Sequence, residues 1–305
     1  MKVFYSPEYV GSAYSFETTR KAKWVADSLT ASPILGIEMV APRPLSAEQV
    51  EQVHEPAYVS AVQTGEPRSL AESQGFVWDA GLWPMVLASN GGAVAAALEA
   101  LDAGLSGSLS SGLHHARRSY GGGFCTFNGL VIAARAVLAA GARAVLVLDL
   151  DAHCGGGTAS LIREEPRVWQ TDVAVCGFDA YGSLAGDHDR IRLRIVGRAG
   201  EYLGAIEAAL EETARAGQPF DLCLYNAGMD PYERCPTGGL PGITQEILTA
   251  RERMVFAWCR EHAAATAFVL AGGYIGPALD EEGLVDLHRL TLSAAAKPAI
   301  ASPAL

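Results

Sequence analysis

The chain has 305 residues, of which 50% are hydrophobic and 19% are charged. This composition is ordinary for a globular protein and is sufficient for a sizeable hydrophobic core. Acidic residues outnumber basic ones by 34 to 23, and the resulting net charge of −11 argues against a nucleic-acid partner, which needs a basic face. An acidic surface suits a cationic substrate or simply keeps the protein in solution.

Six cysteines are scattered along the chain without a CxxC pair, which indicates reduced thiols and a cytoplasmic location. The first residues contain no basic segment followed by an apolar core, so we predict no signal peptide. The stretch 80–98 lacks charge but contains Pro84, Asn90 and a pair of glycines. We therefore expect a helix of a soluble protein there and no membrane partner.

No repeat or linker divides the chain, so we predict one catalytic domain over residues 1–305. From about residue 90 the expected order is helix 89–104, strand 107–111, helix 128–142, strand 144–151, helix 156–165, strand 168–175, helix 199–217, strand 221–228, helix 243–262 and strand 265–273. Alternating helices and continuously apolar strands are typical of a parallel sheet covered on both faces. The predicted fold class is α/β, a three-layer α/β/α sandwich with a central, mostly parallel sheet.

Four strand ends carry polar or glycine-rich sequence. The segments are SSGLHHARRSYGGGFC, DLDAHCGGG, NAGMDPYE and AGGYIG. In folds of this class ligands bind at the carboxyl ends of the strands. We therefore expect these four segments to form one site.

The residues of these segments first of all predict a metal-binding site. Asp151 and His153 are two positions apart, so on an extended chain they face the same side. Asp230 follows another apolar strand and is the best third ligand. Two oxygens and one imidazole leave a coordination position open, which is typical of catalytic zinc. Read separately, the two aspartates also suit helix N-caps, and the histidine also suits an ordinary loop position.

Acid–base chemistry is the second predicted function. The adjacent His114 and His115 suit a general base and a general acid, because their pKa values lie near neutral pH. Asp149, on the same face as Asp151, is placed to orient one of the two imidazoles. Tyr274 follows two glycines and is a candidate donor to a developing oxyanion.

The four motifs together resemble those of the histone deacetylase superfamily, which includes acetylpolyamine amidohydrolases and acetoin-utilisation proteins. They occur in the family's order, and HEPAYVSAVQTG extends the resemblance toward the N-terminus. The resemblance implies an arginase–deacetylase fold and one Zn²⁺ per chain held by Asp151, His153 and Asp230. It implies water activation by the histidine pair and oxyanion stabilisation by Tyr274. Further residues that it implies are Phe124 and Tyr181 as walls of an acyl-lysine tunnel, Gly123 and Gly272 as substrate-binding residues, and Asp149 and Asp172 near a structural K⁺.

Two positions depart from the family pattern HHG[DN]G. Cys154 replaces its second histidine, and Gly156 replaces the Asp or Asn that supports the second active-site histidine. His114 therefore keeps Asp149, whereas His115 has no partner that the sequence reveals. A carboxylate neighbour raises the pKa of a histidine, so we expect His115 to be the neutral general base and Gly156→Asp to raise its pKa.

The sequence thus favours a zinc-dependent amidohydrolase that removes an acetyl or similar acyl group from an amine such as acetyl-lysine or an acetylpolyamine. One alternative is a two-manganese enzyme related to the ureohydrolases, although Cys154 and Gly156 remove candidate ligands for a second metal. Another is a non-catalytic ligand-binding relative, for which the unsupported His115 is the only argument. The oligomeric state, including a homo-oligomer, stays open.

Overall fold

The computed structural model describes residues 1–12, 17–182 and 190–297. Its strands are β1 (Lys2–Phe4), β2 (Glu38–Val40), β3 (Leu105–Ser108), β4 (Val145–Asp149), β5 (Val168–Ala174), β6 (Ile191–Ile195), β7 (Leu222–Ala227) and β8 (Thr266–Leu270). Its helices are η1 (Pro7–Val10), α1 (Glu17–Ala31), α2 (Ala47–Glu51), α3 (Pro56–Thr64), α4 (Arg68–Ala71), α5 (Leu82–Ala103), α6 (Gly129–Ala139), α7 (Gly156–Ile162), α8 (Ala199–Arg215), α9 (Gln245–His262) and α10 (Glu281–Ala296).

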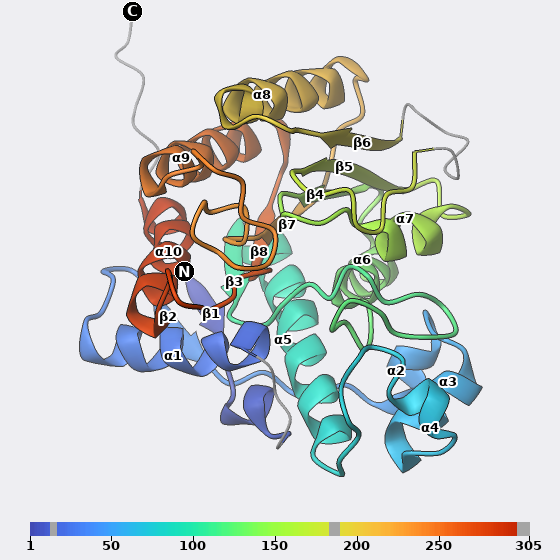
Figure 1. Cartoon of the computed structure of the whole chain (residues 1–305). Coiled ribbons are helices and arrows are strands. Elements are labelled where there is room, and N and C mark those ends of the chain that lie inside the picture. Colours follow the sequence, from blue (N-terminus) through green and yellow to red (C-terminus); the bar gives the residue numbers. More distant parts are fainter. Residues whose placement is uncertain (13–16, 183–189, 298–305) are drawn as a thin grey trace, which may run out of the picture.

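The strands form one sheet in the order β2-β1-β3-β8-β7-β4-β5-β6. Every pairing in it is parallel. Helices cover both faces of the sheet, so the predicted three-layer sandwich is confirmed (Figure 1). The expected strands from residue 107 onward correspond to β3, β4, β5, β7 and β8, whereas β1, β2 and β6 were not predicted.

Alternating residues of the central strands build two separate cores. In β4, Val145 and Val147 belong to the core under α5, α6 and α7, whereas Leu146 and Leu148 belong to the core under α8, α9 and α10. This alternation follows from the two-residue period of a strand. Because both faces are buried, β4, β7 and β8 consist mostly of apolar residues.

Helix α5 is the central helix of one layer, in contact with α6 and with strands β1, β3, β7 and β8. By length and composition alone it is able to cross a membrane, and 67% of its most apolar window is buried inside the protein. A mostly buried apolar helix is typical of the core of a globular domain. The six cysteines form no disulfide.

Strands β3, β8, β7 and β4 are consecutive neighbours in the sheet. Since all are parallel, their carboxyl ends lie along the same edge, and the four polar segments that follow them meet there. The expectation that these segments share one site is therefore met by the topology.

Candidate active site

Three side chains at this edge form a group able to hold a metal ion. One ligand atom each from Asp151, His153 and Asp230 lies within 4.8 Å of the others, and all three residues are buried. The Nδ1 atom of His153 is 3.1 Å from Asp151 Oδ1 and 3.2 Å from Asp230 Oδ2. The structure thus brings together the three metal ligands that the sequence predicts.

Backbone amides hold the two carboxylates in place. Gly272 N–H donates to Asp151 Oδ2 over 2.7 Å, and Ala152 N–H donates to Asp230 Oδ1 over 2.9 Å. A Cβ atom at Gly272 would lie 2.0 Å from Asp230 Oδ2, so only glycine allows the chain to approach so closely. Asp230 Oδ2 is buried and accepts no backbone N–H from the described residues, while His153 Nδ1 lies 3.2 Å away. One nitrogen and carboxylate oxygens, one of them without a backbone donor, fit a catalytic zinc site.

Buried hydrogen bonds also fix the segment that carries the histidine pair. The amide of Asn128 donates to the carbonyl oxygens of His114 and Ala116, both over 3.3 Å, while its Oδ1 accepts from Val131 N–H and caps α6. His54 Nε2 accepts from the Asn128 N–H over 3.0 Å. The backbone of the segment that carries His114 and His115 is therefore held by the start of a helix.

The two histidines contact each other and a carboxylate each. His114 Nδ1 is 2.8 Å from Asp149 Oδ2, as the sequence predicts, and the Nε2 atoms of the two rings are 3.0 Å apart. His115 Nδ1 is 3.0 Å from Asp179 Oδ2. The partner of His115 that the sequence does not reveal is therefore supplied by the loop after β5. An aspartate at position 156 has no room beside Asp179 in this structure, since a Cβ at Gly156 would lie 2.3 Å from the Asp179 carbonyl oxygen.

The surroundings separate the pKa values of the two imidazoles. Burial lowers the pKa of His114, but the nearby Asp149 and Asp151 outweigh burial and raise it to about 10. Burial and the positive charge of His114 lower the pKa of His115 to about 4, although Asp179 opposes this shift. The causes that lower the pKa of His115 are thus burial and His114 rather than a missing carboxylate.

Tyr274 lies beside the histidines in a small cavity of about 30 Å³. The lining residues include His114, His115, Gly123, Phe124, Asp151, Gly272 and Tyr274. Burial and the charges of Asp230 and Asp151 raise the pKa of Tyr274, so its hydroxyl stays protonated and is able to donate. Gly123 has a left-handed φ of 51°, and a Cβ there would lie 2.3 Å from the His115 ring.

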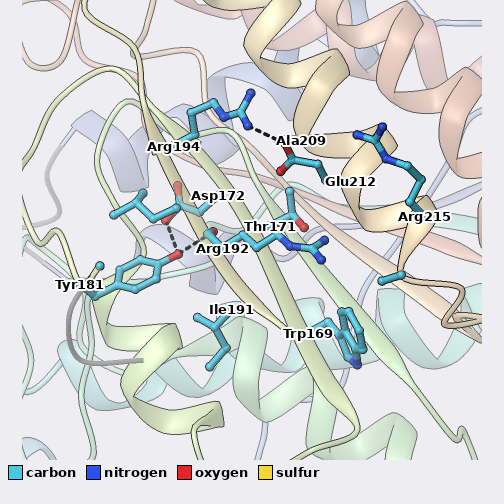
Figure 2. A pocket seen from close by; sticks show the side chains of 13 residues that line it. Trp169, Thr171, Asp172, Tyr181, Ile191, Arg192, Arg194, Ala209, Glu212 and Arg215 are labelled. Carbon is cyan, nitrogen blue, oxygen red and sulfur yellow. Dashed lines mark hydrogen bonds and ion pairs between the residues drawn. The ribbon is translucent and has the colours of Figure 1, made fainter. Parts of the chain in front are cut away.

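Tyr181, the predicted second wall of the tunnel, lies away from the active-site cavity. Figure 2 shows Tyr181 in a different cavity, of about 860 Å³, where its hydroxyl donates to Asp172 Oδ2 and Arg192 O over 3.2 and 3.1 Å. Tyr181 therefore does not line the active-site cavity. The aromatic ring of the loop after β5 that contacts the site is Phe178, which lies edge-on to His115 and His153 with centroids 5.0 and 6.0 Å away.

Asp172 faces Asp149 across the β4–β5 pairing, close to the expected K⁺ position. Its Oδ2 accepts from Gly155 N–H over 2.7 Å, whereas its Oδ1 is buried and accepts nothing from the described residues. Burial and the charge of Asp149 raise its pKa well above the usual range.

The histone deacetylase domain family matches residues 15–283 of the chain. An uncharacterised protein of Picosynechococcus is 33% identical over 231 residues, which cover 74% of this chain and 75% of that protein. Acetylpolyamine amidohydrolase 2 of Pseudomonas aeruginosa is 28% identical over 183 residues, covering 56% of this chain and 50% of that enzyme. A crystal structure of acetylpolyamine aminohydrolase from Burkholderia pseudomallei shares the fold, with a TM-score of 0.78, 20% identity, and 96% of this chain and 98% of that chain covered.

Proposed function

Because the chain belongs to the histone deacetylase family, we propose that it is a zinc-dependent amidohydrolase that removes an acetyl or similarly small acyl group from an amine. Membership of a deacetylase family supports hydrolase activity on acylated amines. The observation that carries the proposal is the placement of the Asp151–His153–Asp230 group next to the His114–His115 pair, with both contributing to one cavity.

Each group around the cavity has a chemical role in amide hydrolysis. A zinc ion held by Asp151, His153 and Asp230 would supply Lewis-acid polarisation of the amide carbonyl and activation of water. The neutral His115 accepts the proton of the attacking water at Nε2. The cationic His114, held by Asp149, stabilises negative charge beside it. The Tyr274 hydroxyl donates to the oxygen that becomes negative, and the leaving amine takes a proton from the histidine pair.

The cavity and the charge of the protein support a substrate class. A cavity of about 30 Å³ between the histidines and Tyr274 favours an acyl group as small as acetyl. The net charge of −11 favours a cationic amine. The relative in Pseudomonas aeruginosa is named for acetylpolyamines, which are cationic. Acetyl-lysine in a protein is the other amine that we propose to test.

The alternative functions have less support. A two-manganese centre needs further ligands, but Gly156 offers none and the Cys154 thiol is turned to the carbonyl oxygen of Cys176, 3.3 Å away. A non-catalytic relative was suggested only by an unsupported His115, and Asp179 supplies that support.

We also propose a K⁺ ion near Asp149 and Asp172, for which the buried Asp172 Oδ1 without a hydrogen-bond donor is the support. The raised pKa of Asp172 favours instead a protonated carboxyl that needs no cation. Activity in K⁺ compared with tetramethylammonium at equal ionic strength separates the two, since only an ion site gives a dependence on K⁺.

The test of the proposed function uses zinc-loaded protein with an acetyl-lysine peptide and an acetylated polyamine as substrates. We expect acetate release from at least one, with one zinc per chain. Asp230→Ala should fold, lose most of its metal and lose activity. Full zinc occupancy in that variant, or two equivalents of manganese in the native protein, would contradict the proposal.

A further inference from the structure

We infer that Asp179, in the loop after β5, is the positioning residue of His115, and that Gly156 is a glycine because Asp179 takes the space beside it. The inference rests on the proposed function for its catalytic consequence. The contact itself is independent of that function. It assigns to a residue outside the metal loop the task of orienting the second histidine.

The contacts of Asp179 fix the orientation of the His115 ring. Asp179 Oδ2 accepts from Gly157 N–H over 3.1 Å and lies 3.0 Å from His115 Nδ1. A carboxylate is only an acceptor, so Nδ1 must carry the ring proton. The Nε2 atom of a neutral His115 then carries the lone pair that a general base requires, 3.0 Å from His114 Nε2.

Arg117 holds the other oxygen of the same carboxylate. Its Nη2 pairs with Asp179 Oδ1, and its Nη1 donates to the Gly156 carbonyl oxygen over 3.1 Å. Only 12% of the Asp179 side chain is exposed. Both carboxylate oxygens of Asp179 therefore have a hydrogen-bond or charge partner, and these partners fix the position of the carboxylate.

The backbone of Asp179 explains how one short loop provides both a ring and a carboxylate. Successive residues of an extended chain point to opposite sides. Asp179 has a left-handed φ of 61°, which interrupts that alternation, so Phe178 and Asp179 both contact His115. Among residues with a side chain, Asp and Asn adopt this conformation most readily.

Gly156 and Asp179 exclude each other sterically. A Cβ at Gly156 would lie 2.5 Å from Asp179 Oδ1 and 2.7 Å from its Cγ, far inside van der Waals contact. A side chain at 156 and the present carboxylate therefore have no room together. The glycine in the metal loop and the aspartate after β5 are two parts of one arrangement.

The experiment compares Asp179→Ala and Asp179→Asn with the native protein. Asn keeps an oxygen acceptor and the left-handed backbone, so it should retain more activity than Ala. We expect Ala to lower kcat about 10²-fold with little change in KM, because orientation of the base acts on the transition state. Bound metal and the thermal unfolding midpoint should change little, and if Ala fails to fold, the Asn variant decides.

Asp221→Asn is the matched control. Asp221 also pairs with an arginine and accepts backbone amides, from Arg143 and Ala144, but it lies just before β7, at the opposite edge of the sheet. Its loss should leave kcat unchanged. If Asp221→Asn lowered kcat as much as Asp179→Ala, the loss would reflect removal of an arginine-paired carboxylate in general. The inference that Asp179 orients His115 would then fail.

A measurement without substrate separates this inference from the proposed function. Nitrogen NMR of the histidine side chains reports the tautomer of His115. Nδ1 should be protonated in the native protein and in Asp179→Asn, whereas the two tautomers should mix in Asp179→Ala. An unchanged tautomer in Asp179→Ala would overturn the inference even if the enzyme is an active deacetylase. Absence of any deacetylase activity, with the tautomer changed as expected, would overturn only the proposed function.

Discussion

Tyr274 is the residue whose substitution should distinguish an effect on the catalytic step from an effect on substrate binding. Only 8% of Tyr274 is exposed, and its raised pKa keeps the proton on the oxygen. Tyr274→Phe removes one donor to the developing oxyanion, which typically lowers kcat by about 10²–10³-fold. Steady-state kinetics should show this loss with a far smaller change in KM. An unchanged kcat would mean that the ring is merely packed.

Metal binding should release a proton from His153. Although burial lowers its pKa, hydrogen bonds to Asp151 and Asp230 outweigh burial and raise the pKa to about 11. The metal-free site therefore holds this proton at pH 7 and above, and a metal must displace it. We expect release of about one proton per metal and an affinity that rises about tenfold per pH unit between roughly pH 7 and 9. Calorimetry in buffers of different ionisation enthalpy measures the release, and a heat independent of buffer would contradict it.

The group of Asp151, His153 and Asp230 could be predicted from the sequence because its members follow strands that the apolar pattern reveals. Asp179 and Phe178 could not be predicted in the same way. Their contacts with His115 depend on a left-handed backbone in a loop, which no periodicity reports. One usable signal was present: the loop follows β5, a direct neighbour of β4, so its carboxylate belongs to the same edge of the sheet.

Helix α9 connects the two loops that carry the metal ligands. Its Arg251 is fully buried and donates to the Leu150 carbonyl oxygen over 3.3 Å, next to Asp151. The same guanidinium reaches the sulfur of Met229, next to Asp230, over 3.5 Å. It also pairs with Glu252 over 2.7 Å.

Arg251→Met should therefore destabilise the fold and loosen the metal site together. Removing one partner of a buried ion pair typically costs about 3–5 kcal/mol, because Glu252 keeps an uncompensated charge. Zinc affinity should fall about 10–100-fold, as for other residues that orient metal ligands. Denaturant unfolding and metal titration measure the two effects. Arg253→Met, an exposed position on the same helix, is the control, and equal effects in both variants would contradict the assignment.

The strands missed in the sequence are short or lie at the edge of the sheet, and helices α1 to α4 and α10 lie outside the stretch for which elements were predicted. β1 and β2 contain three residues each, too few for a pattern to be recognised. β6, with the sequence IRLRI, lies at the edge of the sheet and alternates arginine with apolar residues. Charged side chains on an edge strand prevent pairing with another chain, so its sequence differs from that of the central strands.

At the scale of the whole molecule, the parallel sheet brings distant parts of the chain into register. β4 lies between β5 and β7, and β8 lies between β7 and β3. The Ala152 N–H reaches Asp230 across 78 positions of sequence. Hence no single segment of the chain contains the complete site.

This topology has a consequence for the order in which the protein assembles. Parallel neighbours need a crossover, so none of the eight strands is able to form a local hairpin with the next, and folding should be slow. The proposed zinc site would require β4 and β7 to be paired first. In refolding from urea, uptake of zinc should therefore follow the slowest change in tryptophan fluorescence with the same rate constant, and zinc should not accelerate that change. Tight uptake of zinc before the slow phase would show that the ligands meet without the sheet.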